Sequence, residues 1–323
     1  MSGKTAPFTV SVIATVLNEA GNVAALIDSL AAQTRQPDEV VIVDGGSTDG
    51  TLERAREAVA GRLKLVLLPL PGANISEGRN AAIARASGEV IAVTDAGVRL
   101  RVDWLEQLLA PFERRPGRVD VVSGFFEADP QNVFELAMGA TVLPNREEIN
   151  PVRFLPSSRS VAFTREAWKR VGGYPEWLDY CEDLVFDMAL RDAGLVFAWA
   201  PGATVLFRPR GDMRAFWRQY YRYARGDGKA GLFPRRHLAR YASYLAGALL
   251  LLASLRRRRA LLPLLLGAAL HLRTPYERLA PRLGGLAPAQ RAEVIAWVPV
   301  IRLVGDLAKM AGYPAGVLWR LRR

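Results

Sequence analysis

The sequence predicts an α/β protein with a parallel sheet, followed by a basic and apolar helical tail. Through residue 114, short β-branched runs alternate with segments of helical spacing, which is typical of a parallel sheet covered by helices. From residue 201 onward the chain is rich in leucine and holds 23 Lys and Arg against 5 Asp and Glu. One cysteine among 323 residues excludes an internal disulfide framework.

Strands and helices are expected in close succession over the first 114 residues. We predict strands at residues 10–17, 39–44, 63–68 and 90–95, and helices at residues 23–32, 51–60, 76–86 and 104–114, with Ser76 as an N-cap. Ligands bind at the carboxyl ends of parallel strands. Three of these ends carry acidic groups, namely Glu19, Asp44 and Asp95. Acidic residues are also common in turns, but three at corresponding ends favour a binding site.

The pattern loosens after residue 120, with no long linker and no internal repeat. We expect strands at residues 121–127, 195–199 and 205–208, and helices at residues 130–139, 164–172, 181–193 and 214–225. Thr164 is the predicted N-cap of the second of these helices, which ends at a Gly-Gly pair.

Two segments of the first half carry a recognisable pattern. Residues 41–51 read V-I-V-D-G-G-S-T-D-G-T, and residues 10–20 read V-S-V-I-A-T-V-L-N-E-A. Together they resemble the strand, Gly turn and nucleotide-binding loop of the family 2 glycosyltransferases, whose fold is called GT-A. The resemblance implies that Thr15, Glu19 and Asp44, with Asn18 in the same loop, bind the uracil and ribose of a donor such as a UDP-sugar.

The donor diphosphate is expected between Arg79 and Asp95. Arg79 opens a predicted helix, as an Arg-Asn pair does in that family, and a helix N-terminus and a guanidinium both attract phosphate. A solvated arginine is the alternative. The family's D-x-D motif reads Asp95-Ala96-Gly97 here, so only the first carboxylate is present. Mg²⁺ or Mn²⁺ on Asp95 and the phosphates is the implied cofactor; otherwise Arg79 or Arg222 would neutralise the leaving diphosphate.

Glu182 and Asp183 follow Gly-Gly-Tyr-Pro at the head of a predicted helix. This arrangement resembles the family's E-D acceptor motif, and the resemblance makes Asp183 the catalytic base. Direct displacement at the anomeric carbon needs such a base, because the acceptor hydroxyl loses its proton as it attacks. The alternative is that both acids simply favour the helix dipole.

Three further residues resemble the Q-x-x-R-W motif of processive family 2 synthases, with Tyr223 in place of the tryptophan. Gln219 and Tyr223 are one helical turn apart, with Arg222 beside them, and would cover the acceptor or the diphosphate. An amphipathic helix at a membrane surface explains the same pattern. Arg159 lies where relatives line the acceptor pocket and is a candidate for an anionic acceptor, with an ordinary loop as the alternative.

The tail contains two apolar runs, residues 238–255 and 260–272, separated by four arginines at residues 256–259. A spanning helix needs roughly 20 apolar residues, and a single crossing would place the arginines outside. We expect in-plane or re-entrant helices on the cytoplasmic leaflet, with a transmembrane hairpin as the second choice. The alternative for the whole tail is a soluble helical subdomain. A polar stripe on residues 294–311 fits an interfacial helix.

These observations predict a GT-A catalytic domain over residues 1–230 and a helical membrane-associated region over residues 231–323, at the cytoplasmic face of the cell membrane. We expect inverting, non-processive sugar transfer from a nucleotide sugar to a lipid or lipid-linked glycan, in envelope polysaccharide synthesis. The apolar tail argues against nucleic acid as a partner. The alternatives are a non-catalytic nucleotide-sugar-binding or scaffold protein and a nucleotidyltransferase, although the latter would need a basic residue near residues 18–22.

Overall fold

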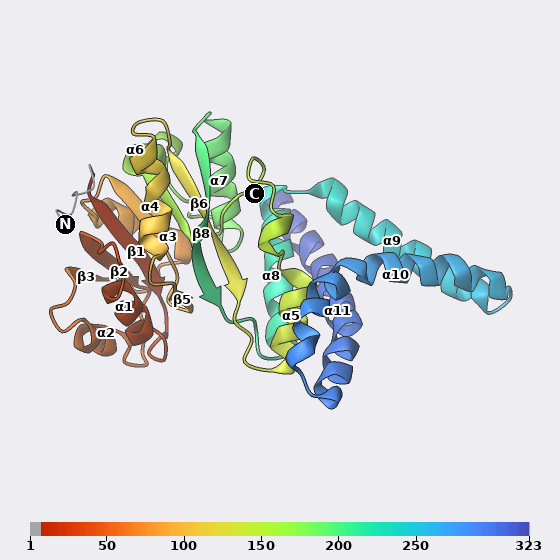
Figure 1. The fold of residues 1–323 in the computed structure, drawn as a ribbon. Coiled ribbons are helices and arrows are strands. Elements are labelled where there is room, and N and C mark those ends of the chain that lie inside the picture. Colours follow the sequence, from red (N-terminus) through yellow and green to blue (C-terminus); the bar gives the residue numbers. More distant parts are fainter. Residues whose placement is uncertain (1–7, 323) are drawn as a thin grey trace. The chain divides into compact units, whose positions relative to one another are not determined.

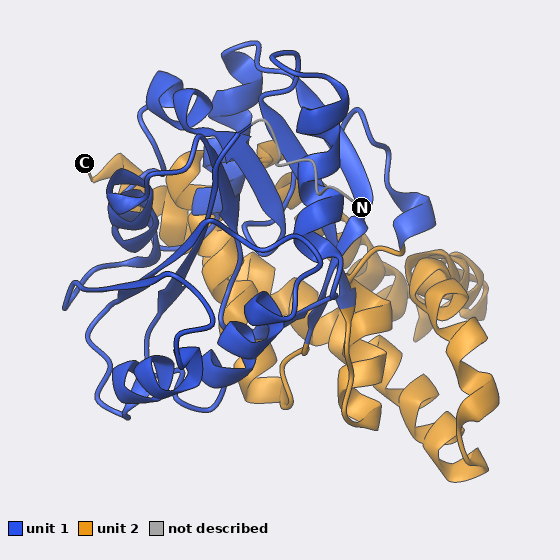
Figure 2. Ribbon diagram, turned by 60° about the vertical axis from the view of Figure 1, so that its left-hand side comes forward, with its two compact units in different colours: residues 1–127, 146–207 blue, residues 128–145, 208–323 orange. Residues whose placement is uncertain are grey.

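The computed structural model describes residues 8–322. The chain forms two compact units (Figure 2). Unit 1 consists of residues 1–127 and 146–207, and unit 2 of residues 128–145 and 208–323.

Unit 1 is built on one eight-stranded sheet in the order β3-β2-β1-β4-β7-β6-β8-β5. Its strands are β1 (Val10–Val16), β2 (Glu39–Asp44), β3 (Leu65–Pro69), β4 (Val90–Val93), β5 (Val98–Leu100), β6 (Val121–Ala128), β7 (Val161–Thr164) and β8 (Phe197–Phe207). Its helices are α1 (Val23–Ala31), α2 (Thr51–Val59), α3 (Ile75–Arg85), α4 (Trp104–Arg114), α6 (Arg165–Val171), α7 (Glu182–Asp192) and the 3₁₀ turn η1 (Arg146–Glu148).

The first four strands of the sheet order are parallel, as predicted. β1 pairs with β2 on one side and β4 on the other, and β2 pairs with β3. Val16 lies opposite Asp44 in this register, and Asp95 follows β4 by two residues. The carboxyl ends of β1, β2 and β4 therefore meet at one edge of the sheet.

Both faces of the sheet are covered by helices (Figure 1). Successive side chains of a strand point to opposite faces, so Val12 and Ala14 of β1 lie on one face and Ile13 on the other. Val12 packs in the core with α1 and α4, whereas Ile13 packs in the core with α3, α6 and α7. Helices on both faces leave the strand ends as the place where polar groups collect.

Local structure departs from the sequence expectation at four places. The N-cap of α3 is Asn74 and not Ser76, because Asn74 forms a capping box with Glu77. β8 is one strand through Pro201-Gly202, where we expected a break; Gly202 lets Gln107 of α4 approach the strand. The short strands β5 and β7 were not predicted, since three or four residues carry little periodicity.

Unit 2 is helical. It contains α5 (Val133–Val142), α8 (Met213–Ala230), α9 (Pro234–Ser254), α10 (Leu261–Leu279), α11 (Pro288–Leu321) and the 3₁₀ turns η2 (Arg258–Ala260) and η3 (Ala280–Gly285). Leu136, Phe216 and Val298 belong to its buried core. The units divide the chain differently from the predicted boundary at residue 230, because α8 packs along α11.

α9 and α10 run side by side and extend beyond the other helices of unit 2 (Figure 1). Among residues 8–322, none of the helices combines the length and the hydropathy that crossing a bilayer requires.

The contact between α8 and α11 depends on glycine. A Cβ atom added at Gly312 would overlap the backbone carbonyl oxygen of Tyr221, and one added at Gly316 would overlap that of Arg225.

Replacing either glycine by alanine should therefore lower the free energy of unfolding, measured by urea denaturation, by about 1–3 kcal/mol through overpacking. Gly267→Ala in α10 is the control, since nothing lies within 4 Å of its Cβ position; it should be neutral or stabilising. Equal effects of all three changes would contradict this role of the two glycines.

Candidate active site

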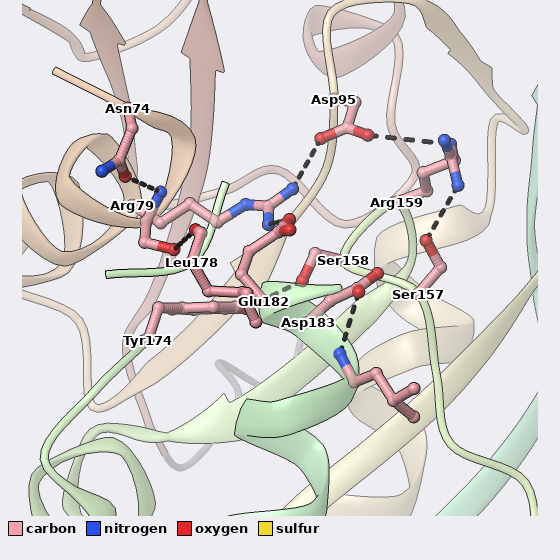
Figure 3. A network of polar contacts seen from close by, with 12 residues as sticks. Asn74, Arg79, Asp95, Ser157, Ser158, Arg159, Tyr174, Leu178, Glu182 and Asp183 are labelled. Carbon is pink, nitrogen blue, oxygen red and sulfur yellow. Dashed lines mark hydrogen bonds and ion pairs between the residues drawn. The ribbon is translucent and has the colours of Figure 1, made fainter. Parts of the chain in front are cut away.

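A buried arginine joins three elements of unit 1 at the edge where the parallel strands end. Arg79, in the second turn of α3, has a side chain only 3% exposed. One terminal nitrogen donates to Glu182 Oε1 of α7 at 2.7 Å, and the other donates to Asp95 Oδ1 at 3.1 Å (Figure 3). Its Cζ lies 5.3 Å from the ring centre of Tyr174. The guanidinium therefore fixes two carboxylates that are 87 residues apart in the chain.

Asn80 fastens the loop before α7 to α3. Its amide oxygen accepts hydrogen bonds from the Tyr174 backbone N–H at 2.9 Å and from Trp168 Nε1 at 3.1 Å. Its amide nitrogen donates to the Tyr174 carbonyl at 2.9 Å. Gly173 has φ +84°, and a Cβ there would lie 2.6 Å from Asn80 Oδ1. Gly173 is thus required for this close approach. Of the neighbouring residues Arg79 and Asn80, the first forms the ion pairs and the second holds the loop before α7 in place.

α7 begins with a strained residue followed by the two acids. Cys181 has φ +66°, a left-handed conformation that non-glycine residues rarely adopt. Glu182 points to Arg79 and is buried, whereas Asp183 is partly exposed and accepts a hydrogen bond from the Leu184 backbone N–H at 2.8 Å. Glu182 is therefore held in an ion pair, and Asp183 is the member of the pair that solvent or a substrate reaches.

The charges of this cluster shift one another's pKa values. Burial, with the neighbouring Asp183, raises the pKa of Glu182 to about 7 although Arg79 opposes the shift. Burial would lower the pKa of Arg79, but Asp95 and Glu182 outweigh it and raise that pKa above its usual range. Strongly perturbed groups of this kind cluster at functional sites.

Three contributors to this cluster were not singled out from sequence. The Tyr174 hydroxyl lies 2.9 Å from Ser158 Oγ, and its ring stacks on Phe186 at 4.1 Å. Asp187, one turn after Asp183, is buried, and within residues 8–322 its Oδ2 has no hydrogen-bond partner. Burial and Asp183 raise the pKa of Asp187. The aromatic residue after Gly-Gly was the available signal for Tyr174, and Ser158 adjoins Arg159 in the segment expected at the acceptor pocket. Nothing local marks Asp187.

The loops that follow β1 and β2 form a compact set of polar turns. The Asp44 carboxylate is 2% exposed and accepts hydrogen bonds from the backbone N–H groups of Gly46 and Ser47 at 3.2 and 3.0 Å. Asn18 Oδ1 accepts from the Thr48 N–H at 3.0 Å, which ties the loop after β1 to the loop after β2. Asp44 thus shapes the turn itself.

The two remaining residues predicted to bind the donor are Thr15, near the end of strand β1, and Glu19, in the loop after β1. Glu19 Oε2 accepts a hydrogen bond from Asn22 at 2.7 Å. Thr15 lies beneath the start of α3, where a Cβ added at Gly78 would be 2.8 Å from Thr15 Cγ2. Nucleotide contacts of Thr15, Asn18, Glu19 and Asp44 stay predictions.

The residues at Asp95 do not form a site suited to a divalent metal. Asp95 is the one carboxylate of its loop, and the structure over residues 8–322 contains no cluster of three or more His, Cys, Asp or Glu that could bind a metal. Both Asp95 oxygens are engaged by cations: Oδ1 by Arg79 and Oδ2 by Arg159 Nε at 3.7 Å (Figure 3). A metal ion there would have one protein ligand and two adjacent positive charges.

The Q-x-x-R-Y residues belong to unit 2. Gln219 and Tyr223 lie on one face of α8, as expected, and are joined by a hydrogen bond of 2.7 Å from Gln219 Nε2 to the Tyr223 hydroxyl. Gln219 is buried and Arg222 is exposed. A role of these three residues toward acceptor or diphosphate stays a prediction.

Known proteins are similar to this chain in sequence and in fold. Residues 11–164 match the sequence model described as Glycosyl transferase family 2. The chain is 29% identical over 225 residues to the succinoglycan biosynthesis protein ExoA of Rhizobium meliloti, covering 66% of this chain and 67% of that protein. It is 28% identical over 249 residues to the glycosyltransferase AglE of Haloferax volcanii, covering 73% and 78%.

A solved structure extends the likeness to the fold. The mannosyltransferase PcManGT from Pyrobaculum calidifontis, solved in complex with GDP-Man and Mn²⁺, matches with a TM-score of 0.55 at 20% identity, over 97% of this chain and 87% of that chain. The fold is GT-A.

Residues 11–164 form a glycosyltransferase family 2 domain, and the chain is an enzyme. Its activity is that of a glycosyltransferase in polysaccharide or glycoconjugate synthesis. The alternatives of a non-catalytic scaffold and of a nucleotidyltransferase are therefore set aside. The matched segment ends before Glu182 and Asp183, so the assignment of those two residues depends on their geometry at the start of α7.

The raised pKa of Glu182 has a measurable effect on stability. Between its ordinary pKa of 4.5 and about 7, Glu182 carries a proton in the folded protein, where its Oε1 still accepts the Arg79 hydrogen bond, and is ionised in the unfolded chain; above that range Glu182 is the ionised partner of Arg79. The folded state then binds the extra proton, so this group lowers the free energy of unfolding by about 1.4 kcal/mol per pH unit as pH rises through that window. Glu182→Gln should remove this part of the slope in urea denaturation between pH 5 and 7, with Glu166→Gln as a surface control. Parallel curves for wild type and Glu182→Gln would contradict the assignment.

Proposed function

We propose that this enzyme transfers a sugar, with inversion and one unit at a time, from a nucleotide-diphosphate sugar to a hydroxyl of a lipid or lipid-linked glycan. The observation that carries the proposal is the pair at the start of α7. Arg79 donates a hydrogen bond to Glu182, whereas the next residue, Asp183, is partly exposed. A base must reach the acceptor, and of the two acids only Asp183 is accessible and outside the ion pair with Arg79.

The proposed reaction is a single displacement. Asp183 accepts the proton of the acceptor hydroxyl as that oxygen bonds to the anomeric carbon from the face opposite the diphosphate. The bond between the anomeric carbon and the diphosphate oxygen breaks, and the nucleoside diphosphate leaves with the electron pair. Attack from the opposite face inverts the anomeric centre. Arg79 stays fixed and offers positive charge close to the leaving group.

The donor is proposed to be a UDP-sugar. Its support is the polar strand-end set of Thr15, Asn18, Glu19 and Asp44, whose pattern resembles the uracil and ribose site of the family. The Pyrobaculum mannosyltransferase binds GDP-Man, so GDP-sugars are the alternative to compare. The Mn²⁺ bound in that neighbour supports binding of Mg²⁺ or Mn²⁺ at Asp95. The positive charges of Arg79 and Arg159 beside Asp95 oppose it.

The removal of the base provides the first test. Purified protein is incubated with UDP-, GDP- and dTDP-sugars and membrane lipid extract, and free nucleotide and the anomeric configuration of the product are measured. Asp183→Asn should lower kcat by about 10²–10⁴-fold and leave nucleotide binding unchanged, because it removes a proton acceptor and keeps the side-chain shape. Asp192→Asn, at the exposed end of α7, is the control. Full activity of Asp183→Asn, or a retained anomeric configuration, would refute the mechanism.

Attachment to the cytoplasmic face of the membrane is proposed through α9 and α10. Ten leucines of this helix pair and its turn are at least 56% exposed: Leu238, Leu245, Leu249, Leu251, Leu252, Leu255, Leu262, Leu265, Leu266 and Leu270. So much exposed apolar surface is unusual for a protein surrounded by water. Exposed arginines flank it at both ends, at residues 235–236 and 256–259. A helix pair with cations at both ends and leucines between them suits an in-plane position among anionic lipids.

Co-sedimentation with vesicles of phosphatidylcholine and phosphatidylglycerol tests this surface. Leu251→Gln/Leu265→Gln should weaken vesicle binding at least about tenfold, since each buried leucine contributes about 1.5–3 kcal/mol. Val152→Gln replaces an exposed apolar residue of unit 1 and should have no effect. Equal binding of the leucine variant and wild type would rule out α9 and α10 as the attachment surface.

A further inference from the structure

Asp95 lies between two guanidinium groups that have different surroundings. Arg79 is 3% exposed and bound to Glu182 as well, so it is fixed. Arg159 is 20% exposed, and its Nε is 3.7 Å from Asp95 Oδ2, a longer and weaker contact than the 3.1 Å of Arg79. Of the two arginines, Arg159 therefore makes the weaker contact with the Asp95 carboxylate.

The Arg159 side chain is oriented by its neighbours. Its Cζ lies 4.4 Å from the ring centre of Phe207 and 5.6 Å from that of Phe126. Its Nη1 donates to Ser157 Oγ at 3.0 Å. Packing of the guanidinium on a ring fixes its plane, and the N–H groups along the edge of that plane have the fork geometry that suits a phosphate.

The loop after β4 has no second carboxylate near Asp95 that could bind a metal ion. Gly97 stands two residues after Asp95, and nothing lies within 4 Å of a Cβ built there. Its φ lies outside the left-handed region, so a side chain fits this position. The missing second carboxylate is thus not imposed by packing. The diphosphate of a nucleotide sugar carries two negative charges, and Arg79 and Arg159 place two guanidinium groups beside Asp95.

We propose that Arg159, together with Arg79, takes the place of a divalent cation beside Asp95, so that the donor diphosphate is bound and leaves without a metal ion. The proposal rests on the proposed function, because it concerns the same donor site. When the donor enters, Arg159 turns from Asp95 to the diphosphate oxygens. It then neutralises the charge that develops as the bond to the anomeric carbon breaks.

Nucleotide binding tests the proposal without relying on turnover. UDP and GDP are each titrated by calorimetry into the full chain, once with EDTA and once with Mn²⁺. We expect one of them to bind equally well in both conditions. Arg159→Gln should weaken its binding about 10- to 100-fold, as the loss of a charge-assisted contact does. Arg159→Lys should fall between, since it keeps the charge but loses the planar fork. Arg56→Gln, in an exposed pair on α2, should bind like wild type.

A second variant tests whether a divalent cation can replace the Arg159 guanidinium beside Asp95. Arg159→Gln/Gly97→Asp supplies the missing carboxylate and removes the guanidinium. We expect Mn²⁺ to restore nucleotide binding in this double variant by about tenfold or more, and EDTA to abolish the gain, because a second carboxylate completes a usual cation site. No rescue by Mn²⁺, or nucleotide binding by wild type that requires Mn²⁺, overturns the proposal.

Sugar transfer measured in EDTA and in Mn²⁺ distinguishes the proposed role of Arg159 from the proposed transferase reaction. Sugar transfer by wild type in EDTA supports both. Sugar transfer only with Mn²⁺ overturns the role of Arg159 and leaves the transferase reaction in place. Absence of transfer from every donor in both conditions defeats the proposed function, whatever the binding results.

Discussion

The buried guanidinium of Arg79 is the interaction on which the active-site edge depends. It connects α3, the loop after β4 and the first turn of α7 through two carboxylates. A charge this deeply buried is tolerated only because both partners are in place, and removal of one would leave the other uncompensated. The geometry of Asp183 follows from this, because its neighbour Glu182 is anchored and Cys181 sets the direction of the helix start.

A division of labour results among acidic residues that look alike in the sequence. Glu182 and Asp95 hold arginines, Asp44 holds a turn, Asp187 is buried, and Asp183 remains accessible to an acceptor. The surroundings of each carboxylate, and not its residue type, decide which of them can take a proton. An enzyme of this fold can therefore carry several acids at one edge while only one is placed as the base.

The sequence predicted the parallel half of the sheet well, since β1 and β2 are buried apolar runs of six or seven residues and the helices between the strands have clear spacing. It also predicted that Asp44, Asp95 and the loop after β1 lie at one edge of the sheet, and the structure places them there. Short antiparallel strands such as β5 were missed because three residues show no period. The pairing of Arg79 with Glu182, 103 residues away, and the stacking of Arg159 on Phe207 arise from tertiary packing and leave no local pattern.

The order of the chain through the two units limits how the protein can be divided. It leaves unit 1 after residue 127, returns at residue 146 and leaves again after residue 207. α5, whose Leu136 and Ala137 are buried against the helices of unit 2, is thus inserted between β6 and β7. A fragment cut after residue 207 would keep α5 but lose every helix that covers it, and the bared leucine and methionine side chains would favour aggregation. A soluble catalytic fragment would need residues 128–145 replaced by a short polar connection as well.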